Sequence, residues 1–169
     1  MKIFLIGMMG SGKTKIGQKL AKALSYKFID IDAFIEEKEE KSIPLLFKEI
    51  GEDKFRELEY HYILKTLEYE DVVVSTGGGL PCFHNNMDLI NSNGISVYLQ
   101  AAPSFLKSRL INNKSSRPLI AEIPNEELEE YIDELLDQRR AYYEKAHIHI
   151  SAINLSEKKV IEEITNRRI

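Results

Sequence analysis

Short apolar runs alternate with longer stretches of helical periodicity along this chain. The runs are rich in isoleucine, valine and phenylalanine, which is typical of buried strands, and they lie at residues 2–6, 28–31, 72–75, 95–99 and 147–151. Helical patterns lie at residues 13–24, 33–40, 52–67, 103–111, 126–145 and 156–167. Strands that alternate with helices form parallel sheets with right-handed crossovers. The pattern therefore predicts an α/β fold with a five-stranded parallel sheet flanked by helices.

The size and composition of the chain indicate one globular domain. The sequence has 169 residues without a repeat, a low-complexity tract or a linker, so we expect a single domain over residues 1–169. A net charge of −4 argues against nucleic acid as the main partner, because neutralising phosphates needs a basic surface. No apolar run reaches the roughly 18–20 residues that span a bilayer, and the first run is too short for a signal peptide. With one cysteine, Cys82, no internal disulfide can form, and we expect a cytoplasmic protein.

The segment from Gly7 to Thr14 follows the first predicted strand and opens the first predicted helix. Its residues, Gly-Met-Met-Gly-Ser-Gly-Lys-Thr, fit the pattern Gly-x-x-x-x-Gly-Lys-Ser/Thr in the strand–helix context that the pattern requires. Glycines let backbone N–H groups turn inward around phosphate oxygens, and the positive end of the helix dipole lies at the same place. Lys13 can reach the β- and γ-phosphates, and the Thr14 hydroxyl can bind magnesium. The segment therefore predicts a nucleoside triphosphate site.

Two acids, Asp30 and Asp32, stand where the second predicted strand ends. Alternation along a strand places them on one face, so both carboxylates are expected to point toward the nucleotide site. One acid can bind magnesium directly or through water, and the other can accept a proton from a substrate hydroxyl. The alternative is that these acids only cap the helix expected from Ala33. The functional interpretation is favoured, because two acids lie beside a nucleotide loop.

The helix expected from residue 52 carries Arg56 and, three residues later, Glu59. Arg56 offers a planar fork that suits a carboxylate or a phosphate, and Glu59 can pair with it and orient it. A surface salt bridge is the common alternative for such a pair. On its own, the motif leaves the two interpretations open.

Three consecutive glycines, Gly77, Gly78 and Gly79, follow the apolar strand expected at 72–75. Such a run indicates that the backbone approaches something closely or bends sharply. Exposed N–H groups beyond the end of a strand can bind substrate oxygens. Because a simple tight turn rarely needs three glycines, the functional interpretation is favoured.

Two segments that contain arginine have both a functional and a purely structural interpretation. Arg117 lies in the polar stretch 112–120, which is typical of a mobile flap that closes over a γ-phosphate, and a solvated loop arginine is the alternative. Arg139 and Arg140 form a basic step on an otherwise acidic helix, where salt bridges along the helix face are the alternative. The sequence leaves these alternatives open.

In this order, the motifs resemble those of shikimate kinases, small P-loop kinases of aromatic amino-acid biosynthesis that use ATP to phosphorylate the 3-hydroxyl of shikimate. The resemblance spans essentially the whole chain and rests on Asp-x-Asp at 30–32, Phe-Arg-x-x-Glu at 55–59, Gly-Gly-Gly at 77–79 and Arg-Pro-Leu at 117–119. It implies a three-layer fold with a substrate-binding helical region at about residues 32–60 and a mobile lid at about residues 111–124. It also implies ATP and shikimate as substrates, Mg²⁺ as the metal, and a monomer.

The resemblance further implies which residues hold the nucleotide. Thr14 takes the magnesium position, and Asp30 lies near the metal through water. Arg117 is the lid arginine on the phosphates and contributes to catalysis together with Lys13, while Arg109 packs against the adenine. The ATP phosphates are wrapped by Gly10, Ser11, Gly12, Lys13, Thr14 and Lys15.

The acceptor side follows from the same resemblance. Asp32 matches the acid that hydrogen-bonds the ring hydroxyls and acts as the base. Arg56 and Arg139 match the two arginines that clamp the shikimate carboxylate. The family frequently has Pro-Leu-Tyr after the second of these arginines, whereas this chain has Ala-Tyr-Tyr at 141–143, and the register selects Arg139 rather than Arg140. Backbone contacts to the substrate come from Gly77, Gly78 and Gly79.

Two other functions fit the sequence less well. Another small P-loop metabolite kinase, of the gluconate or nucleoside monophosphate type, should lack the paired arginines together with Gly-Gly-Gly, and this chain has both. A regulatory domain that binds ATP without catalysis would commonly have lost Lys13 or Asp32, and both are present. A kinase of the shikimate type is therefore the favoured prediction.

Overall fold

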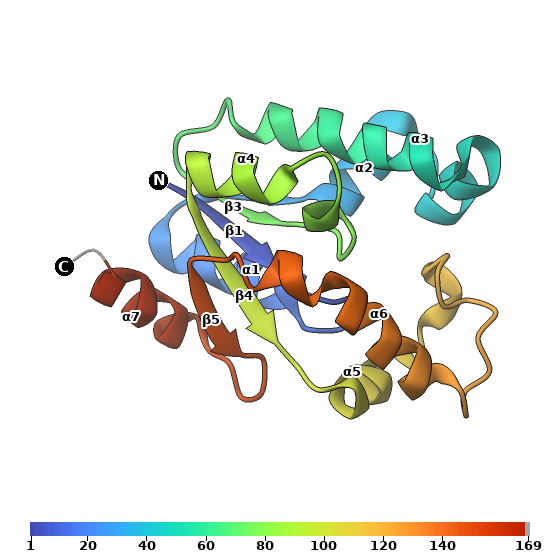
Figure 1. Ribbon diagram of the computed structural model, residues 1–169. Helices are drawn as coiled ribbons and strands as arrows, with labels where there is room; N and C mark the ends of the chain where they lie inside the picture. The colour runs from blue at the N-terminus through green and yellow to red at the C-terminus, as the bar shows by residue number, and fades with distance from the viewer. Residues whose placement is uncertain (168–169) are drawn as a thin grey trace.

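The computed structural model describes residues 1–167 and has one parallel β-sheet at its centre (Figure 1). The strands follow the order β2-β3-β1-β4-β5, so the first strand lies in the middle of the sheet. Their bounds are β1 Lys2–Ile6, β2 Lys27–Asp30, β3 Val72–Ser75, β4 Ile95–Gln100 and β5 Ile148–Ser151. Every neighbouring pair is parallel. The α/β fold with a five-stranded parallel sheet is thus confirmed.

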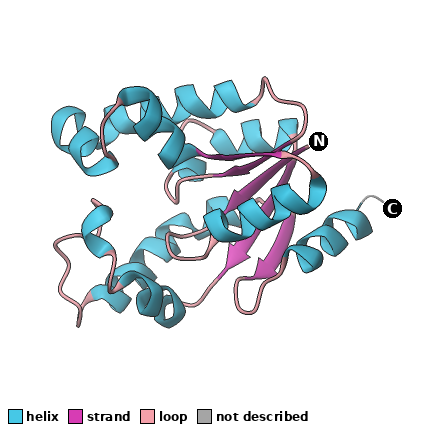
Figure 2. Ribbon diagram, turned by 180° about the vertical axis from the view of Figure 1, so that it is seen from behind, coloured by secondary structure: helices cyan, strands magenta, loops and turns pink. Residues whose placement is uncertain are grey.

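Helices cover both faces of the sheet, because its central strands are apolar on both sides (Figure 2). In β1, Ile3 and Leu5 pack into one core, while Phe4 and Ile6 pack into another. Alternate residues of a single strand therefore belong to two separate cores, which gives the molecule three layers. The helices of the first core are α1 (Lys13–Leu24) and α7 (Glu157–Arg167), and those of the second are α2 (Ile31–Glu39), α3 (Ile43–Thr66), α4 (Asn86–Asn93), α5 (Pro103–Leu110) and α6 (Leu128–Tyr143).

The second helix begins earlier than the sequence pattern predicts, and this takes Asp32 out of the strand. Strand β2 ends at Asp30, and α2 begins at Ile31. Asp30 is the N-cap of α2, because its Oδ1 accepts a hydrogen bond from the Ala33 N–H at 3.3 Å. The prediction that strand alternation places both acids on one face is therefore wrong. Asp32 instead belongs to the first helical turn, and Asp30 caps the helix through one carboxylate oxygen while the other accepts a hydrogen bond from Thr14.

Two other helical segments also differ from the sequence pattern. Helix α3 begins at Ile43 rather than at residue 52, with the Ser42 hydroxyl accepting from the Leu45 N–H at 3.4 Å at its start. Gly51, with φ 78° and ψ 172°, bends this helix and interrupts the helical periodicity, which explains the late predicted start. Helix α4 has no counterpart in the sequence pattern, because it is rich in asparagine and has little intrinsic helix propensity. Packing of its buried Met87 and Ile90 holds it in place.

The segment predicted as a lid joins α5 to α6. It contains turns and the short 3₁₀ helix η2 (Lys114–Ser116), and Figure 1 shows it in yellow to orange at the end of the molecule away from the chain termini. A second 3₁₀ helix, η1 (Leu80–Cys82), follows the three glycines. Of the helices in the described part of the chain, none has the length and apolarity needed to cross a membrane.

The carboxyl ends of three neighbouring strands meet at one edge of the sheet. Gly7 begins the loop after β1, Asp30 ends β2, and the glycine run follows β3. The strand ends are level, because Ser75 of β3 pairs with Leu5 on one side and with Asp30 on the other. Ligands of parallel α/β sheets bind beyond this edge. The fold therefore brings the predicted motifs together.

Candidate active site

A cavity of about 530 Å³ opens at the carboxyl edge of the sheet and collects almost all the residues predicted to be functional. Ser11 is the exception, since it does not line the cavity and its hydroxyl is buried without a hydrogen-bond partner among residues 1–167. The predicted residues that line the cavity are Gly10, Gly12, Lys13, Thr14, Lys15, Asp30, Asp32, Arg56, Gly77, Gly78, Gly79, Arg109, Arg117 and Arg139.

The loop between β1 and α1 adopts a conformation that needs its glycines. Gly10 and Gly12 have φ angles of 82° and 92°, which residues other than glycine rarely adopt. A Cβ at Gly12 would lie 3.2 Å from an Arg109 nitrogen, so Arg109 passes close over the loop. Arg109 also lies on the ring of Phe105, with its Cζ 4.4 Å from the ring centroid. The loop and Arg109 together form one side of the cavity.

Lys13 is buried beneath this loop. Its Nζ donates hydrogen bonds to the carbonyl oxygens of Gly7 at 2.8 Å and Met8 at 2.9 Å. Burial lowers the pKa of Lys13 to about 8, and the positive charge of Arg117 adds to this effect. A bound phosphate would raise this pKa again, because it brings negative charge next to the ammonium group. Lys13 is therefore an ammonium group whose charge a phosphate ligand would stabilise.

Thr14 and Asp30 place two oxygens side by side at the start of α1 and the end of β2. Thr14 Oγ1 donates a hydrogen bond to Asp30 Oδ2 at 2.6 Å. Magnesium prefers oxygen ligands, and in nucleotide sites it takes one or two from the protein and the rest from phosphates and water. The described residues contain no group of three or more His, Cys, Asp or Glu that could hold a metal on its own. The Thr14–Asp30 pair thus has the donor chemistry for magnesium bound together with a nucleotide.

Asp32 lies in the cavity with a raised pKa. Burial, followed by the nearby charge of Asp30, raises the pKa of Asp32 to about 6. The positive charges of Lys13, Arg117 and Arg56 oppose this rise. A carboxylate with a pKa close to neutral is well matched to accept a proton at pH 7. Asp32 therefore has the properties of a general base for a hydroxyl group.

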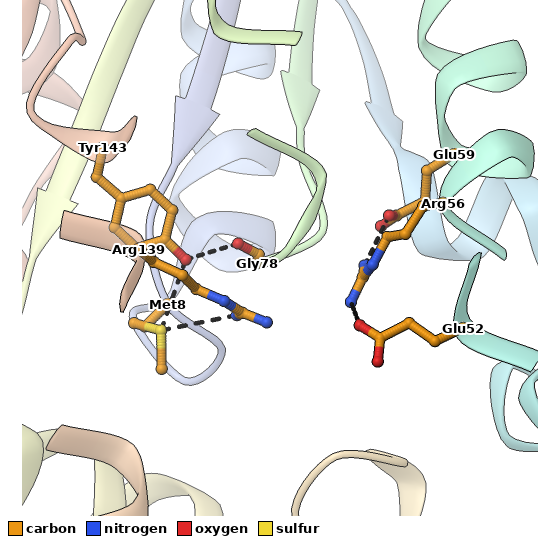
Figure 3. Close-up of polar contacts among 7 residues, drawn as sticks. All are labelled: Met8, Glu52, Arg56, Glu59, Gly78, Arg139 and Tyr143. Carbon is orange, nitrogen blue, oxygen red and sulfur yellow. Dashed lines mark hydrogen bonds and ion pairs between the residues drawn. The ribbon is translucent and has the colours of Figure 1, made fainter. Parts of the chain in front are cut away.

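Arg56 and Glu59 of α3 do not form a surface salt bridge. Their side chains lie in the protein interior, with 4% of Arg56 and 2% of Glu59 exposed. Arg56 Nη1 donates to Glu59 at 2.7 Å and Nη2 donates to Glu52 at 2.8 Å (Figure 3). Burial raises the pKa of Glu59 to about 7, although Arg56 works against this. Glu59 and the Phe83 ring, 4.7 Å from the Arg56 Cζ, hold the guanidinium at the cavity wall.

Arg139 of α6 lines the same cavity and is 5% exposed. Its Nη1 donates to Met8 Sδ at 3.8 Å, and within residues 1–167 it forms no ion pair. Figure 3 shows the guanidinium groups of Arg139 and Arg56 pointing toward the space between them. The helix-face alternative instead describes Arg140, which is exposed and pairs with Asp137 at 2.8 Å. A buried guanidinium without a carboxylate partner favours an anionic ligand.

Each of the three glycines packs against a side chain of the cavity. A Cβ at Gly77 would lie 2.6 Å from a carboxylate oxygen of Glu59, and one at Gly79 would lie 2.5 Å from Arg56 Nη1. At the glycine between them, a Cβ would lie 3.2 Å from Arg139 Nη1. The close backbone approach predicted from the sequence is confirmed, and the neighbours are the acid and the arginines of this chain.

Arg117 reaches the cavity from the lid. Its Nε is buried and has no hydrogen-bond partner in the described part of the chain. Arg117 lines the cavity together with Lys13 and Asp32, and its positive charge lowers the pKa of both. These observations favour the interpretation of Arg117 as a lid arginine over that of a solvated loop arginine.

Sequence reasoning missed three residues that do not line the cavity but contact residues that do. Glu52 lies four residues before Arg56, a helical spacing that could have revealed the pair. Tyr143 donates a hydrogen bond to the Gly78 carbonyl oxygen at 2.6 Å. Met8 accepts from Arg139 although 131 positions separate them, and no sequence signal in a single chain indicates such a contact.

Comparisons with known proteins agree with this geometry. The family model for shikimate kinase matches residues 9–168. A shikimate kinase of Phocaeicola vulgatus is 47% identical over 161 residues, which cover 95% of this chain and 92% of that protein. The structure of a shikimate kinase from Bacteroides thetaiotaomicron is similar with a TM-score of 0.89 at 37% identity, covering 99% of this chain and 97% of that one. A shikimate kinase from Acinetobacter baumannii, in complex with shikimate, gives a TM-score of 0.88 at 31% identity over 99% of this chain and 92% of that one. The chain therefore belongs to the shikimate kinase family.

Proposed function

We propose that this chain transfers the γ-phosphoryl group of ATP to the 3-hydroxyl of shikimate, with the residues described above in the roles that follow. The main support is the pair of buried guanidinium groups, Arg56 and Arg139, in the cavity that also contains the nucleotide loop. Guanidinium forks bind carboxylates through two parallel hydrogen bonds. An acceptor with a carboxylate on a hydroxylated ring matches such a pair, with backbone contacts from the three glycines.

The nucleotide side supplies positive charge to the transferred phosphoryl group. Lys13 leaves the loop carbonyls and binds the β- and γ-phosphates, and Arg117 approaches them from the lid. Magnesium, held by Thr14 directly and by Asp30 through water, would add positive charge at the phosphate oxygens when it is bound. Groups fixed in place before the reaction stabilise developing charge without reorganisation. The loop and the lid arginine together provide this environment.

The acceptor side supplies the base and the orientation. Arg56 and Arg139 fix the carboxylate end of the ring, so that the hydroxyl to be phosphorylated lies next to Asp32. Asp32 takes the proton from that hydroxyl as the phosphoryl group is transferred. A closed lid excludes water, which prevents hydrolysis of ATP in place of transfer.

The finer assignments follow the sequence prediction. We propose one domain over residues 1–169, with the acceptor region at about residues 32–60 and the lid at about residues 111–124. Arg109 lies over the nucleotide loop, which supports the proposal that it packs against the adenine. We also propose that the protein is a monomer and acts in the cytoplasm.

The proposal is tested by measuring ADP release from magnesium-ATP with shikimate, with gluconate and without an acceptor. We expect turnover that requires shikimate, because only this acceptor offers the ring carboxylate that the two arginines suit. ADP release that depends on gluconate would overturn the acceptor assignment. Equal slow release in all three reactions would identify the protein as a nucleotide-binding ATPase without this acceptor.

The rate is expected to depend on pH through Asp32. Its pKa lies at about 6 in the free protein, above the usual value for an aspartate, so the protonated acid accumulates as the pH falls through this value. A protonated Asp32 cannot take the hydroxyl proton. We therefore expect kcat/KM for shikimate to fall about tenfold per pH unit below pH 6. A profile of kcat/KM that stays level down to pH 5 would contradict this role.

A further inference from the structure

Ser75, the last residue of β3, has a hydroxyl that the fold itself does not use. The residue is 2% exposed and lines the active-site cavity. Its hydroxyl forms no hydrogen bond within residues 1–167. The next residue, Thr76, is similarly buried, but its hydroxyl donates to the Leu5 carbonyl oxygen at 3.0 Å. Polar groups in protein interiors nearly always have a partner, so the Ser75 hydroxyl indicates a ligand of the cavity.

The strand register places Ser75 beside Asp30. The two residues are register partners on the neighbouring strands β3 and β2. Register partners share one face of a parallel sheet, and their strands lie about 4.8 Å apart. The preceding partners on this face, Val73 and Phe28, pack into the core that α1 covers, and Thr14 lies in the first turn of α1. Two hydroxyls and one carboxylate, from three elements, therefore converge at this end of the sheet.

These oxygens suit an ion that keeps its waters. Magnesium retains several water ligands when a protein binds it. Asp30 Oδ1 accepts from the Ala33 N–H, which leaves Oδ2, now bonded to Thr14, for the ion or its water. A water bound to a metal ion donates two hydrogen bonds, and a serine hydroxyl has lone pairs to accept one of them. Asp30 and Ser75 can thus accept the two protons of one such water.

We propose that Ser75 is a positioning residue for the divalent cation that accompanies the nucleotide, with its hydroxyl holding a water ligand of that ion next to Asp30. The inference rests on the proposed function, which assigns the ion to Thr14 and Asp30. Groups that orient the ligands of a metal raise its affinity although they do not touch the ion. Ser75 therefore acts on binding of the ion and not on binding of the nucleotide alone.

The test measures the dissociation constant of Mn²⁺ for the complex of the protein with ADP, using the electron paramagnetic resonance signal of the free ion. Mn²⁺ takes octahedral oxygen ligands as Mg²⁺ does, and an excess of protein over ADP leaves no free nucleotide to bind it. Ser75→Ala is expected to weaken Mn²⁺ binding by about tenfold. ADP affinity without metal should be unchanged. The unfolding temperature should not fall, because the lost hydroxyl has no partner in the fold.

Thr76→Val is the matched control, because it removes a neighbouring hydroxyl that does have a partner. It should lower the unfolding temperature and leave the dissociation constant of Mn²⁺ unchanged. Equal Mn²⁺ affinity in Ser75→Ala and the unmodified protein overturns the inference. Weaker binding of metal-free ADP by Ser75→Ala also overturns it, since the hydroxyl would then contact the nucleotide. An unmodified protein that binds ADP but no Mn²⁺ would instead overturn the magnesium site of the proposed function.

Discussion

Replacing Asp32 with asparagine is expected to lower the shikimate-dependent kcat by about a hundredfold to ten-thousandfold, with ADP affinity retained. Asparagine keeps the size of the side chain but cannot accept a proton. The fold should tolerate the change, because burial already disfavours the charged form of Asp32. Steady-state kinetics with saturating magnesium-ATP measure the loss, and calorimetric titration with ADP measures the nucleotide site separately.

Asp53→Asn is the matched control for this substitution. Asp53 is an exposed acid on α3, outside the cavity lining, so the same chemical change there should leave kcat unaltered. A kcat of Asp32→Asn within about tenfold of the unmodified protein would remove Asp32 from the role of base. Loss of ADP affinity together with kcat would instead assign Asp32 to the nucleotide side.

Arg56→Lys is expected to weaken shikimate binding by about tenfold to a hundredfold while nucleotide binding is unchanged. Lysine keeps the positive charge that Glu59 requires but loses the planar fork. Hydrogen bonds to charged groups contribute about 1.5 to 3 kcal/mol, which corresponds to this range of affinity. Arg56→Ala would be a poorer test, because it leaves Glu59 buried without its partner and destabilises the fold.

Arg140→Lys is the matched control for Arg56→Lys. Arg140 also pairs with an acid three residues away, but it is exposed. It should leave the dissociation constants of shikimate and ADP unchanged. Equal shikimate affinity in Arg56→Lys and the unmodified protein would contradict the carboxylate clamp. A parallel loss of ADP affinity would indicate that Arg56 acts on the nucleotide.

The sheet and the nucleotide loop could be predicted from the sequence, because both depend on local patterns. Apolar runs such as Val72–Ser75 are buried on both faces, so they stand out without any knowledge of their partners. The loop motif is contiguous from Gly7 to Thr14. The predicted end of the second strand and the predicted start of the second helix both lie too late in the sequence. The reason is that β2 and α2 follow each other directly, and an apolar residue such as Ile31 fits either pattern.

The arrangement of the cavity wall depends on contacts between distant segments, which local patterns do not encode. The spacing of Arg56 and Glu59 is the same for a surface pair and for a buried one, and only packing against Phe83 and the glycine run decides between them. Met8 lies in the loop after β1, and its sulfur contacts residues of α6. These contacts join segments that lie far apart along the chain.

Buried hydrogen-bonding groups without a partner are concentrated among the residues predicted to be functional. Of the four buried side-chain polar atoms without a partner in residues 1–167, three belong to predicted site residues: Ser11 Oγ, Arg56 Nε and Arg117 Nε. Each such group costs a folded protein about 1 to 3 kcal/mol. Selection for stability alone would replace these side chains with apolar ones of similar shape. These groups lower the stability of the unliganded fold, and a ligand that satisfies them would recover part of this cost on binding.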